Sequence, residues 1–183
     1  TLSHREKKKM KRVRHYEYVL HEVFTFNTLE DFWRMYNNTY QTSEVISNTD
    51  YLIFKKHIKP EWEDPTNRAG GKWVITLPIE DDFEEEVADA WRNLLLYIIG
   101  GQFSFAQMEV INGVIYSIRD KHQRMSIWCR TNPNSSPESQ KLLISIGQFF
   151  KKIVKLPTKY KFSYQLHEKA LKHDLDNEAM LQV

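Results

Sequence analysis

The sequence predicts an α+β fold in which helices cover one face of an antiparallel sheet. Strand-like segments outnumber helical ones, and the helical segments occur singly or after a pair of strands. Most of the strand segments alternate apolar and polar residues, a pattern typical of antiparallel sheets with one covered face. No internal repeat or low-complexity segment interrupts this order.

In the first half of the chain we expect three strands and one helix. Residues 16–26 are rich in aromatic and β-branched residues, which favours a strand. Residues 27–39 change to a helical period, and Asn27 or Thr28 can cap this helix. Its apolar face is formed by Leu29, Phe32, Trp33 and Tyr36. Residues 50–58 predict the next strand, and the stretch 70–78 predicts another that starts just past Gly70 and Gly71 and ends at Pro78.

The second half is predicted to add two helices and three strands. One helix starts in the acidic stretch 80–86, where carboxylates suit a helix N-terminus, and ends at Gly100 and Gly101. Residues 113–130 predict two strands joined by a short turn, and residues 159–167 predict a final strand. Between them, Ser136 and Pro137 are start signals for the clearest helix in the chain.

The composition is that of a folded domain. Of the 183 residues 41% are apolar and 27% charged, and the net charge of +2 gives no global field that would favour a polyanion. The single cysteine, Cys129, excludes an internal disulfide and weakly favours a reducing compartment. There is no run of 18 apolar residues, and residues 1–14 lack the apolar centre of a signal peptide. We therefore expect a soluble, cytoplasmic monomer without a membrane partner.

Three parts of the chain are expected. Residues 1–14 form a basic loop or an N-terminal remnant, residues 15–167 the folded domain, and residues 168–183 a frayed tail with loose helical spacing. The basic run 4–14 has no apolar period. A solvated loop is favoured there over a nucleic-acid contact or an import signal, because such runs are common.

Signatures of catalysis are absent from the sequence. There is no phosphate-binding Gly-rich loop, dinucleotide fingerprint, zinc-protease motif, nucleophile elbow or pair of cysteines. The seven histidines are scattered, and the carboxylates between Asp81 and Glu86 favour a helix cap over a metal site. The sequence therefore predicts a protein that is not an enzyme and has no catalytic residue, metal or cofactor.

Two clusters point instead to binding. Trp62 stands beside Glu63 in a loop punctuated by Pro and Gly, where an indole and a carboxylate suit a flat cationic base. Around the predicted turn of residues 113–130 lie three cations that suit a phosphate chain: Arg119, Lys121 and Arg124. A purine that carries both a positive charge and a phosphate chain is 7-methylguanosine triphosphate.

The blocks "FNTLEDFWRMYN", "FKKHIKPEWEDPTNRAGGKWVITL", "LLLYIIGGQF" and "GVIYSIRDKHQRMSIW" resemble the eukaryotic translation initiation factor 4E family, which binds the 7-methylguanosine cap of messenger RNA. The resemblance runs in order from Tyr16 to His167, and the Trp-Glu-Asp and Gly-Gly-Lys-Trp motifs are highly specific. It implies that residues 15–167 are a cap-binding domain. It also implies a curved antiparallel sheet with helices on its convex face and a ligand slot on its concave face.

The resemblance also implies roles for individual residues. Two aromatic rings would sandwich the methylated guanine, namely Trp62 and, counting back from Trp33 without gaps, Tyr16. Glu63 would hold the guanine edge and Trp128 would contact the methyl group. The phosphates would meet four cations: Arg119, Lys121, Arg124 and, more distantly, Lys72. Tyr16 departs from the Trp of most members, which suggests weaker stacking and resembles the 4E-homologous-protein branch associated with repression.

A second surface is implied on the helical side. There the family receives a partner helix with a Tyr-x-x-x-x-Leu-apolar motif, from a scaffold or repressor protein. The matching positions are Leu29, Trp33, Arg92, Asn93, Leu96 and Gly100. Arg92 and Asn93 depart from the usual apolar and acidic pair, which puts scaffold binding in doubt. Trp73 and Trp91 are expected in the core.

Three alternatives to a cap-binding regulator remain at this point. One is an initiation factor that recruits a scaffold, and another is a protein-interaction module with little cap affinity. The third, a cap-hydrolysing enzyme, is disfavoured because no spaced glutamate cluster for metal-assisted cleavage is present.

Overall fold

The computed structural model describes residues 20–45, 47–80, 83–168 and 179–183. These residues fall into two compact units, with the division between Thr39 and Tyr40. Tyr16 and the basic run 4–14 lie outside the described residues. The division of the chain at residues 14 and 167 stays a prediction.

The first unit contains the helix α2 (Leu29–Asn37). Of the two predicted caps it uses Thr28, whose side-chain oxygen accepts a hydrogen bond from the backbone N–H of Asp31 at 3.1 Å. The rings of Phe32, Trp33 and Tyr36 lie with their centroids 5.3 to 5.7 Å apart. The strand predicted at 16–26 is wrong in its described part, since residues 20–26 are in no strand.

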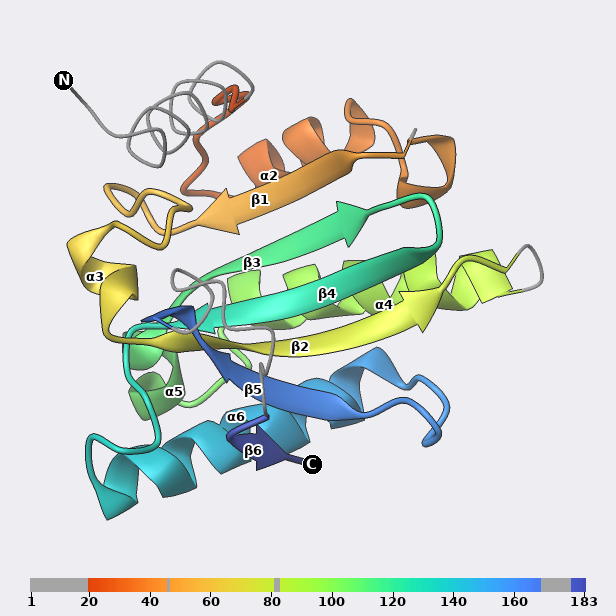
Figure 1. Cartoon of the computed structure of the whole chain (residues 1–183). Helices are drawn as coiled ribbons and strands as arrows, with labels where there is room; N and C mark the ends of the chain where they lie inside the picture. Colours follow the sequence, from red (N-terminus) through yellow and green to blue (C-terminus); the bar gives the residue numbers. More distant parts are fainter. Residues whose placement is uncertain (1–19, 46, 81–82, 169–178) are drawn as a thin grey trace, which may run out of the picture. The chain divides into compact units, whose positions relative to one another are not determined.

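In the described part of the second unit the sheet has six strands in the order β1-β3-β4-β2-β5-β6, and every neighbouring pair is antiparallel (Figure 1). The strands are β1 (Thr49–Phe54), β2 (Gly71–Pro78), β3 (Ile111–Ile118), β4 (His122–Cys129), β5 (Phe162–Leu166) and β6 (Leu181–Gln182). This confirms the predicted α+β fold with an antiparallel sheet. The pair β3 and β4 is the predicted hairpin, and β2 begins at Gly71, one residue before its predicted start.

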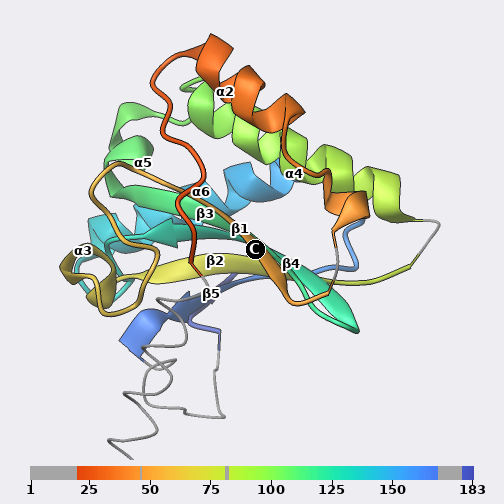
Figure 2. The same cartoon turned by 90° about the horizontal axis from the view of Figure 1, so that it is seen from above.

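Helices of this unit gather on one face of the sheet, which curves beneath them (Figure 2). They are α4 (Glu84–Ile99), α5 (Phe105–Val110) and α6 (Pro137–Val154). Of two short helical turns, η1 (Thr42–Glu44) precedes β1, and α3 (Pro65–Arg68) lies between β1 and β2. The acidic first turn of α4 and the Ser136 cap of α6 are as predicted. None of the helices among the described residues is long and apolar enough to cross a membrane.

The core lies between the sheet and these helices. Trp73 is fully buried and its indole Nε1–H donates to the backbone oxygen of Leu143 on α6 at 2.8 Å. Trp91 on α4 stacks on Tyr116 of β3, with the ring centroids 5.5 Å apart. Both tryptophans are therefore core residues, as predicted.

The end of the chain differs from the prediction. Residues 181–182 add a short strand to the edge of the sheet through the pairs Ser163↔Gln182 and Tyr164↔Leu181. Backbone hydrogen bonds from Met180 and Val183 to β5 continue this pairing. The expectation of a frayed helical tail is thus wrong for these residues, because the open edge of β5 offers hydrogen-bond partners that a solvated helix would lack. Residues 169–178 lie outside the described part.

Candidate functional site

The face of the sheet opposite the helices carries the predicted polar residues. Side chains of cross-strand partners point to the same face, so the pairs Asp50↔Ser117 and Ser117↔Arg124 share one side. The pair Lys72↔Trp128 lies on that same side, since residues 124 and 128 are separated by an even number along β4. We call this side the open face and define it by Asp50, Lys72, Ser117, Arg124, Ser126 and Trp128.

A loop between β1 and β2 presents Trp62 beside this sheet. Trp62 is half-buried and Glu63 is exposed. The loop is held from beneath by Asn67, a fully buried residue of α3. The side-chain amide of Asn67 donates to the backbone oxygens of Lys59 and Glu61, at 2.8 and 2.9 Å. The chain on the N-terminal side of Trp62 is therefore fixed by a side chain that follows it.

The bracing continues into the sheet. Asn112, at the start of β3 and also fully buried, donates from its side-chain amide to the Oδ1 of Asn67 at 2.8 Å and to the backbone oxygen of Thr66 at 3.1 Å. Buried amides that are hydrogen-bonded in this way hold a unique arrangement, because losing one partner would leave the other unsatisfied. The Trp62 loop is thus attached to the sheet by polar contacts.

Asp64 starts α3 and closes the loop on itself. Its carboxylate accepts hydrogen bonds from the backbone N–H groups of Thr66 at 2.8 Å and Lys59 at 3.0 Å. Burial would raise the pKa of this carboxyl, but the two backbone donors outweigh it and hold the pKa below its usual value. Asp64, the acidic residue next to the Trp62–Glu63 pair, therefore stabilises the conformation of the loop.

The two glycines that follow permit close backbone approach. A Cβ atom at Gly70 would lie 1.9 Å from the backbone oxygen of Cys129, and one at Gly71 would lie 2.4 Å from that of Gln165. Any side chain at either position would therefore collide with a neighbouring strand. The glycines let the loop enter the sheet between β4 and β5.

Trp128 lies at the same end of the open face and is 4% exposed. Its ring meets that of Phe54 edge-on, with centroids 5.5 Å apart, and that of His167 at 4.1 Å. His167 is fully buried, and its Nδ1 lies 2.9 Å from the backbone oxygen of Asn67. Since a carbonyl oxygen only accepts, Nδ1 carries the proton and donates it. Burial lowers the pKa of His167 to about 4, against the favourable contact with Asn67, so the ring is neutral at pH 7.

Lys72 stands beside Trp128 on β2. Its Nζ lies 6.0 Å from the centroid of the Trp128 ring. Burial and, next, the charge of Arg124 lower the pKa of Lys72 to about 8, and the carboxylate of Asp50 acts in the opposite direction. The open face therefore holds a cation that keeps its charge at pH 7 at some cost and that an anion would stabilise.

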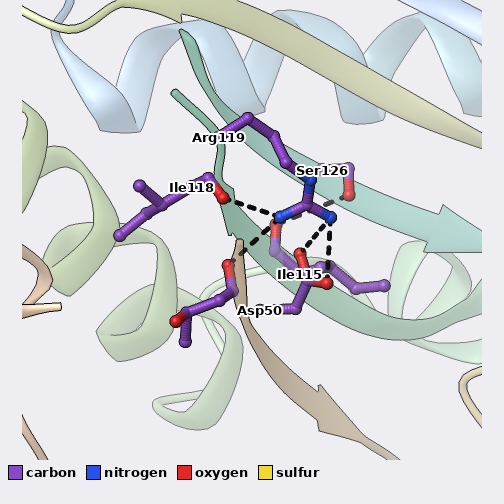
Figure 3. A network of polar contacts seen from close by, with 6 residues as sticks. Asp50, Ile115, Ile118, Arg119 and Ser126 are labelled. Carbon is purple, nitrogen blue, oxygen red and sulfur yellow. Dashed lines mark hydrogen bonds and ion pairs between the residues drawn. The ribbon is translucent and has the colours of Figure 1, made fainter. Parts of the chain in front are cut away.

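The hairpin end of the open face holds the other predicted cations, and they are not equivalent, because Arg119 is the one that contacts Asp50 (Figure 3). Arg119 forms an ion pair with Asp50 across the β1–β3 pair, at 2.9 and 3.0 Å from Nη2 to the two carboxylate oxygens. Arg124 and Lys121 are exposed. Within the described part of the chain, no carboxylate lies within ion-pair distance of either.

The predicted site residues of this unit thus share the open face and the loops at its two ends. Trp62, Glu63, Lys72 and Trp128 lie toward the α3 end, and Arg119, Lys121 and Arg124 toward the β3–β4 turn. Sequence reasoning missed Asn67, Asn112, His167 and Asp50. An asparagine three residues after an Asp-Pro helix start was the one available signal, and it indicates only a local turn. Among the described residues, no group of His, Cys, Asp and Glu could hold a metal ion.

The residues of the predicted partner surface are divided between the two units, and each group is described by itself. In the first unit Leu29 is 56% and Trp33 38% exposed. In the second unit Arg92 pairs with Asp89 one turn before it on α4, at 2.7 Å. Asn93 and Leu96 are half-buried on the same helix, and Gly100 caps its C-terminus.

Comparison with known proteins gives consistent matches. Residues 1–180 match the family model described as Eukaryotic initiation factor 4E. The chain is 34% identical over 157 residues to eukaryotic translation initiation factor 4E1 of Drosophila melanogaster, covering 86% of this chain and 57% of the relative. It is 36% identical over 155 residues to eukaryotic translation initiation factor 4E-1 of Arabidopsis thaliana, covering 85% and 60%. The chain thus spans less than two thirds of the length of these two relatives.

Solved structures give the same result. An eIF4E-3 of C. elegans, solved in complex with the 4E-binding protein Mextli, superimposes with a TM-score of 0.80 at 28% identity, covering 91% of this chain and 88% of that one. An eIF4E-3 of Ascaris suum, solved with an m2,2,7G cap, gives a TM-score of 0.72 at 32% identity, covering 82% and 80%. The fold, the order of the sequence blocks and the family model all agree, and the chain belongs to the eukaryotic initiation factor 4E family.

Proposed function

We propose that this chain binds the 7-methylguanosine cap of messenger RNA and docks a partner helix, and so regulates the initiation of translation without being an enzyme. The observation that carries the cap proposal is the half-buried Trp62 with exposed Glu63 on a braced loop, beside a face that bears Trp128 and Lys72. Such a loop offers one flat ring, one carboxylate and nearby cations, which match a methylated guanine and its phosphates.

In the proposed complex, the guanine stacks on Trp62 and its edge donates hydrogen bonds to Glu63. Tyr16 supplies the second ring, and Trp128 contacts the methyl group. Lys72, Arg119, Lys121 and Arg124 bind the phosphate chain. Holding the Trp62 loop in place before the ligand arrives lowers the entropy cost of binding, which is the role of Asn67 and Asn112.

Relatives support this proposal. The C. elegans eIF4E-3 is also solved with both Mextli and a cap analog, and the Ascaris suum eIF4E-3 with an m7G cap. A schistosome eIF4E is solved with m7GpppG and a 4E-BP. We infer the same two ligand classes for this chain, and with them a place in the cytoplasm.

The finer proposal is a repressor of the 4E-homologous branch. Tyr16 stands where most members have Trp, and a smaller ring stacks more weakly on the base. Arg92 on α4 carries a positive charge into the proposed partner surface. A second candidate, a protein-interaction module with little cap affinity, is favoured by the exposed Trp33 and Leu29. A third is an initiation factor that recruits a scaffold.

The testing experiment is a fluorescence titration with 7-methylguanosine triphosphate and, as control, GTP, on wild type, Trp62→Ala, Trp33→Ala and Tyr16→Trp. We expect quenching selective for the methylated ligand, lost in Trp62→Ala, kept in Trp33→Ala and strengthened in Tyr16→Trp. A helical peptide with the Tyr-x-x-x-x-Leu-apolar motif should show the reverse dependence on the first two variants. Equal binding of GTP and the methylated ligand by wild type would exclude cap recognition and leave the interaction module.

A further inference from the structure

Both terminal nitrogens of the Arg119 guanidinium are bound by the protein itself. A guanidinium has five N–H donors. The Nη1 group donates to the backbone oxygens of Ile118 at 2.7 Å and Thr49 at 3.3 Å. The Nη2 group donates to both carboxylate oxygens of Asp50 (Figure 3). Both terminal nitrogens therefore have partners among the described residues, and none of these hydrogen bonds comes from the Nε–H.

This occupation matters because Arg119 is a proposed phosphate ligand. A phosphate is bound by arginine in the same forked way as a carboxylate, through two parallel N–H donors. A fork uses either Nε and Nη2 or Nη1 and Nη2, and Asp50 occupies Nη2, the nitrogen that both forks share. The Arg119 and Asp50 side chains are 37% and 32% exposed, so an anion can reach the pair from solvent.

The field of Asp50 also reaches beyond Arg119. Lys72 feels the carboxylate of Asp50 and the guanidinium of Arg124, in opposite directions. Asp50 is the one carboxylate among the residues that define the open face, and it interacts with two cations, Arg119 and Lys72. A phosphate chain that enters this face meets a negative charge already in place.

We propose that Asp50 is a positioning residue that competes with the ligand for Arg119, so that a phosphate chain engages the fork of Arg119 only by displacing the Asp50 carboxylate. When a single phosphate displaces Asp50, Arg119 exchanges one anionic partner for another, so little binding free energy is gained. A chain of three phosphates also contacts Lys72 or Arg124, and these contacts offset the free energy lost when the Arg119–Asp50 ion pair breaks. Asp50 thereby makes the site selective for the number of phosphates. This inference rests on the proposed function for the identity of the site, but it concerns the phosphate chain alone.

The test uses the intact chain and inorganic ligands, which separate the phosphate site from recognition of the base. Calorimetry would measure the affinity of wild type and Asp50→Asn for tripolyphosphate and orthophosphate at equal ionic strength. Losing competition from an exposed ion pair corresponds to a gain of up to about fivefold. We expect about that gain for tripolyphosphate and less than twofold for orthophosphate. An unchanged or lower affinity for tripolyphosphate in Asp50→Asn would overturn the proposal.

Two controls separate competition for the fork from a general change in charge. Glu138→Gln, at an exposed position in the first turn of α6, removes one negative charge remote from the open face and should change tripolyphosphate affinity less than twofold. In an Arg119→Lys background, the additional change Asp50→Asn should also have less than a twofold effect, because lysine offers no fork. A full fivefold gain in that background would show that Asp50 acts only through its field, and would overturn the proposal.

A measurement on wild type covers the case in which Asp50→Asn does not fold. The carbon-13 resonance of the Asp50 carboxylate should move when tripolyphosphate saturates the site, and stay in place with orthophosphate. A resonance that tripolyphosphate leaves in place would overturn the proposal. Failure of the proposed function is a separate result: equal binding of GTP and its methylated form, with the Asp50→Asn gain intact, would remove cap recognition and leave this inference standing.

Discussion

The ring of His167 lies against that of Trp128, with the centroids 4.1 Å apart and the planes at 43°. The same histidine donates from Nδ1 to the backbone oxygen of Asn67, and Asn67 holds the loop of Trp62. One buried, neutral side chain therefore contacts the proposed methyl-binding ring and braces the loop of the proposed stacking ring. The Nε1 of Trp128 and the Nε2 of His167 have no hydrogen-bond partner among the described residues.

His167 predicts a loss of stability in acid. Burial lowers its pKa to about 4 in the folded protein, whereas an unfolded histidine has a pKa of about 6.5. Between these values the unfolded chain binds the extra proton, so the free energy of unfolding falls as pH falls from about 6.5 to 4. The expected slope from this group is up to about 1.4 kcal/mol per pH unit. Urea denaturation at a series of pH values measures it.

The matched variant is His167→Phe, which keeps a ring but neither titrates nor donates to Asn67. We expect it to be less stable than wild type at pH 7 by about 1 kcal/mol, because the backbone oxygen of Asn67 loses one of its two donors and keeps the N–H of Gly70. Its stability should fall less steeply than that of wild type between pH 6.5 and 4. The exposed His21, changed to Gln, serves as control. Parallel pH profiles of wild type and His167→Phe would contradict the assignment.

Lys72 predicts that phosphate binding weakens in mild alkali. Burial and Arg124 lower its pKa to about 8, so the ammonium group loses its charge between about pH 7 and 9. An anion binds the charged form, and the affinity contributed by Lys72 is therefore present below pH 8 and lost above it. Lys72→Arg keeps its charge throughout this range. We compare the affinity of Lys72→Arg for tripolyphosphate with that of wild type. The ratio of the two affinities should rise about tenfold from pH 7 to 9.5, because tenfold corresponds to the free energy of one charge-assisted hydrogen bond. A constant ratio would exclude Lys72 as a phosphate contact.

Replacing Gly147 by alanine is expected to destabilise the protein, although alanine has the higher helix propensity. It lies within α6, where alanine would favour the helix by about 1 kcal/mol. A Cβ atom there would lie 2.5 to 2.8 Å from three atoms of the Trp73 indole, which is fixed by its hydrogen bond to Leu143. The collision should outweigh the propensity, and we expect Gly147→Ala to lose about 1–3 kcal/mol. Gln148→Ala, exposed on the same helix, is the control for propensity. Thermal unfolding would decide, and an increased melting temperature in Gly147→Ala would contradict the packing.

The elements that could be predicted from the sequence carry their signals locally. Helix α6 has its cap, its Pro and its apolar stripe within 20 residues, and β3 and β4 alternate on either side of a short turn. Helix α5 and the four residues of α3 are too short to show a period. The strand expected at residues 16–26 failed in its described part because β-branched composition alone does not supply a pairing partner.

The site divides in the same way. The residue types that suit a base and phosphates stand out by composition, as with Trp62 beside Glu63. The residues that hold them do not, because their partners are distant: Asn112 and Asn67 are 45 positions apart, and His167 lies 100 positions from the backbone oxygen it binds. Asp50 is 69 positions from Arg119. The tertiary fold brings such groups together, through strand pairing for Asp50 and Arg119 and through the docking of α3 for Asn67.

Asn67 predicts that the order of the Trp62 loop depends on one buried amide. Asn67→Ala would remove one of the two donors to each of the backbone oxygens of Lys59 and Glu61, which keep the N–H groups of Glu61 and Asp64, and would leave the side chain of Asn112 without one acceptor. Three hydrogen bonds are lost at about 1 kcal/mol each, so we expect a loss of about 3 kcal/mol in the free energy of unfolding. Amide hydrogen exchange should accelerate first in residues 58–66, while that of β3 and β4 stays close to wild type. Asn134→Ala, in an exposed loop, is the control.

In Asn67→Ala, affinity for 7-methylguanosine triphosphate should fall more than affinity for tripolyphosphate, because the loop carries the stacking ring and the strands carry the cations. A uniform loss of both affinities would show that Asn67 supports the whole sheet and not the loop alone.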